Sequence, residues 1–157
     1  MSGLCVRPLR DSVTAMATLF TRIINGEIPG RFVWSDPQCV GFLTMEPLRP
    51  GHTLVVPRDE IDQWTSLSPE ALTQLMSVAQ RIGRAQLEEF GAERIGLLIE
   101  GYGVPHAHVH VWPSQDTSDF DPHNVHRDVP GEELDAAAER LRSRLRTQGN
   151  GDFVPTS

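Results

Sequence analysis

Three histidines alternate with small and apolar residues in one short stretch of the chain. The stretch reads His106, Ala107, His108, Val109, His110, Val111, Trp112 and Pro113. An alternation with period two is typical of a β-strand, whose neighbouring side chains point to opposite faces. We therefore predict a strand over residues 106–113, with the apolar side chains in the core and the imidazoles on one accessible face, about 6.5–7 Å apart. Pro113 should limit the pairing of this strand, because proline has no backbone N–H to donate.

Such a row of imidazoles indicates a chemical role. A structural role would require three buried polar partners in a row, and burying polar groups without partners is costly. Metal binding is one alternative, since two histidines at i and i+2 can share a zinc ion at about 2.0–2.1 Å per bond. However, the outer pair, His106 and His110, would be separated by roughly 13 Å at Cα, and no nearby cysteine or carboxylate pattern completes a tetrahedral site. Metal binding at this row is therefore disfavoured.

Nucleophilic catalysis at phosphorus is the alternative that the row favours. A neutral imidazole is a good nucleophile, and a second imidazole can bind phosphoryl oxygens or protonate a leaving group. Because the ordinary pKa of histidine is about 6.5, one ring can be neutral while another is charged near neutral pH. His52, at the start of another predicted strand, is a candidate fourth member of the group.

The remaining pattern predicts the elements that hold these histidines. We predict a helix over 19–25, strands over 32–34, 39–43 and 52–57, a long helix between Ser68 and Phe90, a buried strand over 94–99 and a final helix over 132–145. The early strands follow one another so closely that antiparallel pairing is the simplest topology. The predicted fold class is therefore α+β, a five-stranded antiparallel sheet with one long helix and short N- and C-terminal helices.

The long helix has a clear start and a clear core face. Ser68 is suited to cap its N-terminus, and Pro69 is suited to its first turn. One stripe of the helix is predicted to be core, and it consists of Leu72, Leu75, Met76, Ala79, Ile82 and Gly83.

The length, net charge and cysteine content of the chain restrict its domain number, its partners and its localisation. At 157 residues the chain fits one domain, which we place at 16–148, after a disordered N-terminal extension (1–15) and before a flexible tail (149–157). The net charge of −7 argues against a nucleic-acid partner, which needs a basic surface. No apolar run approaches the ~20 residues that span a bilayer, so we expect no membrane partner. Cys5 and Cys39 form no disulfide framework and fit a cytoplasmic localisation.

Two further blocks accompany the alternating histidines and give the chain a family resemblance. One is Gly51-His52-Thr53-Leu54-Val55-Val56-Pro57-Arg58, and the other is Ile23-Ile24-Asn25-Gly26-Glu27-Ile28-Pro29. With these blocks at their spacing, the chain resembles the histidine triad (HIT) family of nucleotide hydrolases and transferases from about Met16 to Pro113. The resemblance implies a HIT-like α+β fold, a nucleotide as the small-molecule partner, and a homodimer formed through the long helix and a neighbouring strand.

The resemblance also assigns roles to the histidines. It implies that His108 attacks the α-phosphorus and forms a nucleotidyl-histidine intermediate, while His110 contacts the phosphate and assists the leaving group. It further implies that His106 helps to orient the nucleophile, with His52 beside it. The implied nucleotide-binding residues are Phe32, Phe42, Leu43, Thr44, Met45 and Gly103.

The chain departs from the family pattern at the nucleotide site. Thr44 stands where many members have an aspartate that holds the ribose hydroxyls, and a threonine can make a hydrogen bond but no anionic bidentate contact. Gly103 follows Tyr102 where the family has a serine or threonine after a glutamine, which removes a side-chain contact to the leaving group. The chemistry is therefore better defined by the sequence than the substrate is.

A second departure concerns metal. Family members with structural zinc carry a Cys-x-x-Cys pair near the start, and here those positions are Thr18 and Thr21. The histidine that such members have shortly after Pro57 is absent, and Asp59 and Glu60 stand there instead. We therefore predict no structural zinc, no other metal and no cofactor.

Taken together, the sequence predicts an enzyme that hydrolyses or transfers the nucleotidyl group of a nucleoside phosphoramidate or a dinucleoside polyphosphate. The alternative is a nucleotide-binding protein with weak or no turnover, which Thr44 and Gly103 motivate. A metal-dependent hydrolase is a third hypothesis, and it predicts a stoichiometric metal ion.

Overall fold

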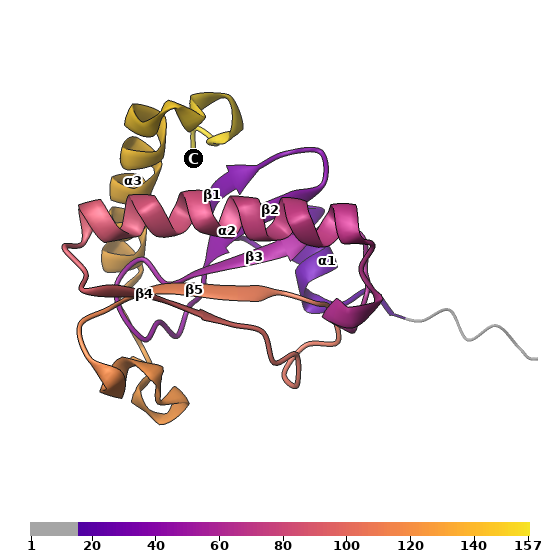
Figure 1. Cartoon of the computed structure of the whole chain (residues 1–157), viewed down its shortest axis with the longest axis horizontal. Helices are drawn as coiled ribbons and strands as arrows, with labels where there is room; N and C mark the ends of the chain where they lie inside the picture. Colours follow the sequence, from indigo (N-terminus) through magenta and orange to yellow (C-terminus); the bar gives the residue numbers. More distant parts are fainter. Residues whose placement is uncertain (1–15) are drawn as a thin grey trace, which may run out of the picture.

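The structure is a computed structural model that describes residues 16–157. Its main elements, in chain order, are α1 (Leu19–Ile24), β1 (Phe32–Ser35), β2 (Cys39–Leu43), β3 (Thr53–Pro57), α2 (Pro69–Glu89), β4 (Arg94–Leu98), β5 (Val109–Ser114) and α3 (Gly131–Leu145) (Figure 1). Short 3-10 turns occur at Trp64–Ser66, Thr117–Phe120, Pro122–Asn124 and Gly151–Phe153, and a π-helical turn occurs at Arg146–Asn150. The predicted extension, 1–15, lies outside the described residues.

The strands form one antiparallel, five-stranded sheet in the order β1-β2-β3-β5-β4. β1, β2 and β3 pair as consecutive neighbours, as the short connections between them predict. α2 then carries the chain across the sheet, so that β4 lies at the far edge and β5 returns between β4 and β3. The structure therefore confirms the predicted α+β class, with one long helix on an antiparallel sheet.

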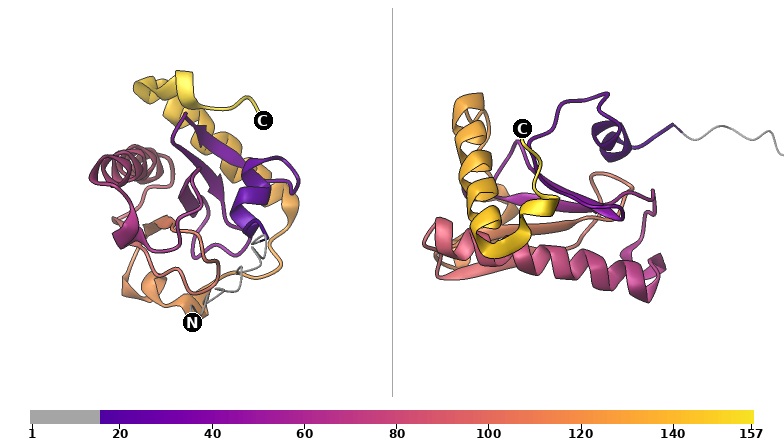
Figure 2. Two further views of the ribbon diagram at one scale, coloured as in Figure 1. Left: turned by 90° about the vertical axis from the view of Figure 1, so that its right-hand side faces the viewer. Right: turned by 90° about the horizontal axis from the view of Figure 1, so that it is seen from above.

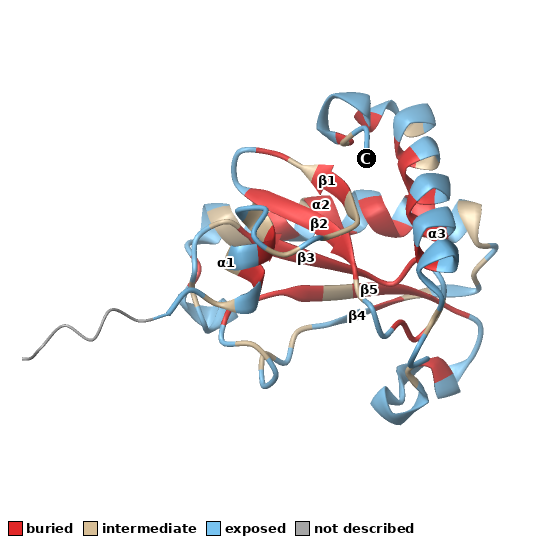
Figure 3. Cartoon of the chain, turned by 180° about the vertical axis from the view of Figure 1, so that it is seen from behind, coloured by how far each residue is buried: buried red, intermediate tan, exposed pale blue. Residues whose placement is uncertain are grey.

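Helices cover the two faces of the sheet unequally, as Figure 2 shows. α2 lies along one face, α3 packs against α2 and β1, and the larger apolar cluster lies between these helices and the strands. α1 lies on the opposite face, over a smaller cluster of Phe20, Ile23, Val40, Phe42, Leu54 and Val56. In Figure 3 the buried residues are concentrated on the strands and on the inner faces of the helices. The face under α1 is the histidine face, because the Phe20 ring contacts His106 and His108.

α2 begins as its sequence predicts. The Ser68 hydroxyl accepts a hydrogen bond from the Ala71 N–H at 3.1 Å, and Pro69 occupies the first turn. The buried members of the predicted stripe are Leu75, Ala79, Ile82 and Gly83. Met76 differs from the prediction and is exposed, because it lies beside the open edge of the sheet at β4.

The histidine segment begins differently from its prediction. The strand starts only at Val109, so His106 and His108 lie in the irregular segment that leads into β5. The alternation of burial still holds, since Ala107, Val109 and Val111 are all buried in the larger cluster. The apolar set therefore faces the core as predicted, although strand pairing covers only part of the row.

Pro113 does not end the pairing of β5. The strand pairs with β4 beyond it, as far as Arg94 opposite Ser114, whereas its pairing with β3 stops at Thr53 opposite Val111. Proline is tolerated where a strand lacks a neighbour that needs its N–H. Because β3 itself begins at Thr53, its pairing with β5 ends before Pro113 is reached, so the predicted limit by Pro113 is wrong.

β4 is not the buried strand that its apolar composition predicts. Leu97 is 45% exposed and Leu98 is 44% exposed. A run of apolar residues is typical of strands that are covered on both faces, but α2 packs mainly over β3 and β5. The side chains of this edge strand are therefore left open.

The end of the chain packs against the domain, where a flexible tail (149–157) is predicted. The Phe153 ring stacks on Trp34 with 5.0 Å between the ring centroids, and Val154 is buried in the larger cluster. These contacts tie the residues that follow α3 to β1. Within residues 16–157, no helix has both the length and the apolar character needed to cross a membrane.

Gly51, directly before His52, combines two constraints that lead to a stability prediction. Its φ is +91°, which side chains rarely adopt, and a Cβ at this position would collide with the Phe90 ring. We predict that Gly51→Ala lowers the free energy of unfolding by about 3 kcal/mol, because backbone strain adds to overpacking. Urea unfolding followed by circular dichroism measures this change.

Gly26→Ala is the matched control for this prediction. Gly26 also has a positive φ, +78°, but no atom lies within 4 Å of an added Cβ. This variant should therefore show only the strain, about 1–2 kcal/mol. Equal losses in the two variants would contradict the collision with Phe90.

Candidate active site

His108 is held in one tautomer by the backbone of His106. Its Nδ1 lies 2.7 Å from the His106 carbonyl oxygen, and because a carbonyl can only accept, Nδ1 must carry the proton. In the neutral ring, Nε2 then has a free lone pair. The Phe20 ring packs edge-on against this imidazole, with 4.8 Å between the centroids. The ring is therefore both oriented and protonated in the way that a nucleophile requires.

His52 and His110 form a second pair with defined protons. The Leu48 N–H donates to His52 Nδ1 at 3.0 Å, so the proton of the neutral His52 ring is on Nε2. That atom lies 3.0 Å from His110 Nδ1, to which it must donate. His110 therefore carries its own proton on Nε2. The ring centroids of His108 and His110 are 5.0 Å apart. Two neighbouring imidazoles therefore carry complementary groups, a lone pair on His108 Nε2 and a proton on His110 Nε2.

His106 is fully buried and acts as the anchor of the row. Its Nε2 lies 2.7 Å from the Pro57 carbonyl oxygen and must donate to it. Its Nδ1 is then an acceptor, and the Thr18 hydroxyl donates to it at 2.8 Å. Both ring nitrogens of His106 are thus occupied by contacts with α1 and with the end of β3, so this histidine positions the backbone and has no free nitrogen.

Burial keeps the other three imidazoles neutral near pH 7. Desolvation is the main cause and lowers the pKa of His52 to about 3, with a smaller contribution from the charge of His110. It lowers the pKa of His110 to about 4, with a smaller contribution from His108. Desolvation also lowers the pKa of His108, more than the hydrogen bond to the His106 carbonyl raises it. The lone pair of His108 is therefore available at neutral pH.

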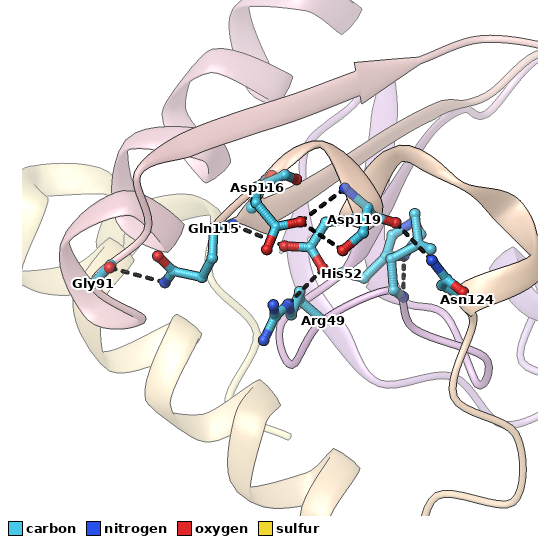
Figure 4. A network of polar contacts seen from close by, with 10 residues as sticks. Arg49, His52, Gly91, Gln115, Asp116, Asp119 and Asn124 are labelled. Atoms are coloured by element: carbon cyan, nitrogen blue, oxygen red, sulfur yellow. Dashed lines mark hydrogen bonds and ion pairs between the residues drawn. The ribbon is translucent and has the colours of Figure 1, made fainter.

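The loop that carries His52 is fixed to the segment that follows β5, as Figure 4 shows. Arg49 Nε donates to Asp119 Oδ1 at 2.7 Å, and the Gln115 N–H donates to Asp119 Oδ2 at 2.8 Å. Burial would raise the pKa of Asp119, but these donors hold it below its usual range. The His52 N–H donates to the Arg49 carbonyl at 3.1 Å, so this ion pair also supports the backbone of His52.

Aromatic residues from the predicted nucleotide-binding set lie on the same face as the histidines. Phe42 packs edge-on against Phe32 at 5.7 Å and against Phe20 at 5.6 Å. Phe20 connects this group to His108, and sequence reasoning misses it, since helical spacing marks it only as buried. Leu43 packs in the larger cluster on the opposite face, because adjacent strand residues point to opposite sides. The structure therefore brings Phe32 and Phe42, but not Leu43, to the histidine face.

The remaining predicted binding residues are more open. Met45 and Gly103 are exposed, and Tyr102 beside Gly103 is 93% exposed. Thr44 is half-buried, and its hydroxyl accepts from the Glu46 N–H at 3.3 Å. The Thr44 hydroxyl keeps its proton free to donate one hydrogen bond.

Comparison with known proteins agrees with this geometry. The family model described as the HIT domain matches residues 25–117, which is more than half of the chain and contains His52 and the histidine row. The chain belongs to the HIT family.

Individual HIT relatives are similar over much of the chain. Protein hit of Bacillus subtilis is 33% identical over 102 residues, which cover 60% of this chain and 69% of that protein. The bifunctional bis(5'-adenosyl)-triphosphatase/adenylylsulfatase FHIT of Arabidopsis thaliana is 29% identical over 123 residues, which cover 74% of this chain and 65% of that protein. A zinc-bound histidine triad family protein from Mycobacterium smegmatis has a similar crystal structure, with a TM-score of 0.74 and 27% identity over 87% of this chain and 98% of that chain.

The residues of this HIT protein do not fit a structural zinc ion. Thr18 and Thr21, which replace the cysteine pair, lie in one hydrogen-bonded group with Glu60 and His106. Zinc in proteins is held by cysteine, histidine and carboxylate, so the two hydroxyls are unsuitable, and the lone pair of His106 Nδ1 already accepts from Thr18. Among residues 16–157, no three His, Cys, Asp or Glu residues are grouped to hold a metal. The absence of structural zinc stays a prediction for elemental analysis.

The lowered pKa values of His52 and His110 predict a pH-dependent stability. In the unfolded chain each ring titrates at about 6.5, so unfolding takes up as many as two protons between pH 6.5 and 4.5. The contribution of the two neutral rings to the free energy of unfolding should be fully present above pH 6.5, and it should fall with decreasing pH by up to about 2.7 kcal/mol per unit. Urea unfolding across this range measures the slope.

The matching variant is His52→Gln, which removes one of these titrating rings. Its slope between pH 6.5 and 4.5 should be smaller than the parent slope by the contribution of one ring, up to about 1.4 kcal/mol per pH unit. A parent stability that is constant across this window would contradict the prediction that the buried rings stay neutral.

Proposed function

We propose that this HIT protein is an enzyme that hydrolyses or transfers a nucleotidyl group through a nucleotidyl-histidine intermediate. The observation that supports the proposal most strongly is the pair of complementary tautomers on neighbouring rings. His108 has its lone pair on Nε2, and His110 has its proton on Nε2. Nucleophilic substitution at phosphorus needs one group of each kind.

The proposed reaction has two steps. His108 Nε2 attacks the α-phosphorus, a nitrogen–phosphorus bond forms, and the bond to the leaving oxygen or nitrogen breaks with its electron pair on the leaving atom. His110 Nε2–H donates a hydrogen bond to this atom and so stabilises its developing charge, and the leaving group then takes up its proton from solvent. In the second step water attacks the phosphorus, the bond to His108 breaks with its electron pair on Nε2, and the water loses one proton to solvent. An acceptor other than water would give nucleotidyl transfer.

The proposed substrates are dinucleoside polyphosphates and nucleoside phosphoramidates. The similarity to a bis(5'-adenosyl)-triphosphatase/adenylylsulfatase supports an adenosine nucleotide as the starting probe. Phe32 and Phe42 would supply the apolar side of the nucleoside site, Thr44 would give one hydrogen bond to the ribose, and the open backbone at Met45 and Gly103 would border the site. The proposal needs no metal and no cofactor, since the attacking atom and the hydrogen-bond donor to the leaving group both belong to histidines.

The first functional prediction concerns the nucleophile. His108→Asn should lower turnover of diadenosine polyphosphates and adenosine phosphoramidates by about a thousandfold or more, while AMP binding is largely kept. Turnover is measured by chromatography of the products, and binding by calorimetry. In the parent, an alkaline quench during turnover should trap an adduct of one nucleotidyl group on His108, detected by mass spectrometry.

His123→Asn is the control for this variant, because it makes the same change at an exposed histidine outside the site. It should keep the parent turnover. Full turnover in His108→Asn would disprove the mechanism. Tight AMP binding by the parent, with no turnover of any probe and no adduct, would favour the alternative of a nucleotide-binding protein without catalysis.

We also infer that the protein forms a homodimer through β4 and α2. β4 is an edge strand, and an exposed edge pairs readily with another strand. Beside it lies an open groove of about 550 Å³ lined by Met76, Gly83, Leu87, Ile95, Leu97 and Val111. A second copy fits this surface best, because two β4 edges can pair antiparallel and cover the same apolar residues on both copies.

This proposal predicts that Leu97→Glu gives a monomer, since it buries a charge in the interface. The control is Leu19→Glu, which changes a leucine of equal exposure, 46% against 45%, on α1 at the opposite face. Light scattering after gel filtration should show a dimer for the parent and the control, and a monomer for Leu97→Glu. A monomeric parent at micromolar concentration would contradict the proposal.

We infer in addition a reducing compartment such as the cytoplasm. Within residues 16–157 Cys39 is a buried thiol without a disulfide partner, and burial raises its pKa. A neutral buried thiol of this kind is stable where disulfides are not formed.

A further inference from the structure

Gln86 on α2 makes an unusual pair of buried hydrogen bonds. Its side chain is fully buried, and its Nε2 donates to the Gly51 carbonyl at 2.8 Å and to the Val111 carbonyl at 2.9 Å. Because both partners are carbonyls, the nitrogen end of the amide must face them. The Gln86 Oε1 atom is then left without a hydrogen-bond partner in the described part of the chain.

Packing alone does not account for this amide. An unpartnered buried oxygen costs free energy, and an apolar side chain would fill the same space without placing that oxygen in the core, although the Gly51 and Val111 carbonyls would then lose their donor. The two bonds therefore point to a role in which the positions of the carbonyls matter. Both carbonyls lie next to proposed active-site histidines in the chain, one directly before His52 and the other directly after His110.

The Gly51 carbonyl and the His52 N–H belong to the same peptide unit. Its N–H donates to the Arg49 carbonyl at 3.1 Å, and its carbonyl accepts from Gln86 and from the Thr53 hydroxyl, the latter at 2.8 Å. The plane of this peptide is thus fixed from three directions. Since the peptide carries His52, its orientation sets where the His52 ring lies.

The second carbonyl fixes the other histidine of the pair. Val111 follows His110 in β5, and its carbonyl is joined to the Gly51 carbonyl through the single amide nitrogen of Gln86. This bridge joins the two residues that lead into β3 to the strand β5, and beside it His52 Nε2 donates to His110 Nδ1 at 3.0 Å. The long, capped helix α2 supplies a rigid mount for the bridge.

We propose that Gln86 is a positioning residue that holds His52 and His110 at hydrogen-bonding distance and so keeps the proton of His110 on Nε2. The proposal rests on the proposed function for its catalytic consequence. Its structural part, the geometry and tautomers of the two rings, is independent of turnover.

The test compares the parent with Gln86→Met, which keeps the length of the side chain and removes both donors. The expected result is a kcat lower by about tenfold to a hundredfold with KM changed little, because small displacements of catalytic groups are costly. Nitrogen-15 NMR should show separate protonated and unprotonated ring nitrogens for His52 and His110 in the parent. In Gln86→Met these signals should shift toward averaged values, while those of His106 and His108 stay unchanged.

Gln74→Met is the matched control on the same helix. The Gln74 amide donates to Asp36 Oδ2 at 3.0 Å, far along α2 from Gln86 and away from the histidines. This variant loses a hydrogen bond of similar kind, so it should lower the melting temperature without changing kcat or the imidazole signals. Gln86→Asn, whose amide is too short to reach both carbonyls, is the second variant and should behave as Gln86→Met does.

The outcomes separate the two proposals. A parent that turns over no probe would refute the proposed function, whereas the NMR comparison would still decide the role of Gln86. Unchanged His52 and His110 signals in either Gln86 variant, together with a lower melting temperature, would overturn the positioning role. If neither variant folds, scalar couplings in the parent from Gln86 Nε2 to the carbonyl carbons of Gly51 and Val111 support the bridge, and their absence overturns it.

Discussion

The hydrogen bond from His108 Nδ1 to the His106 carbonyl is the interaction on which the rest of the site depends. It joins residues two apart in the chain, at 2.7 Å, and leaves the lone pair of the imidazole on Nε2. His106 is itself anchored by its ring contacts with the Pro57 carbonyl and the Thr18 hydroxyl, and these contacts help to hold its carbonyl in place. The anchoring of one histidine thus determines the chemistry of the next.

The other half of the site depends on contacts between distant residues. A chain of hydrogen bonds runs from the Leu48 N–H through His52 to His110. It leaves the proton of His110 on Nε2, whereas the Nε2 atom of His108 has none. Several elements hold this chain of hydrogen bonds in place, among them the Arg49–Asp119 ion pair and the Gln86 amide on α2. Burial of the rings then keeps the whole arrangement neutral, so that no charge disturbs the sequence of donors and acceptors.

The departures from the family pattern fit the same physical picture. Thr18, Thr21 and Glu60 form hydrogen bonds where related proteins with zinc have metal ligands. They tie α1 to His106 without a metal, and α1 in turn places Phe20 against His108. The open edge at β4 has a comparable explanation in the proposed homodimer, in which a second copy would cover the apolar residues that the chain itself leaves exposed.

By itself the sequence determined the local features of the protein. The cap at Ser68, the antiparallel pairing of the early strands and the alternating burial of Ala107, Val109 and Val111 follow from the spacing of neighbouring residues, and the structure contains them. Only the tertiary structure decided the exposure of β4, the contact of Phe20 and the tautomers of the histidines. These features depend on contacts between residues that are far apart in the sequence, such as His52 and His110, which are separated by 58 positions. Such contacts are set by the packing of α1 and α2 on the sheet, and no local sequence pattern predicts that packing.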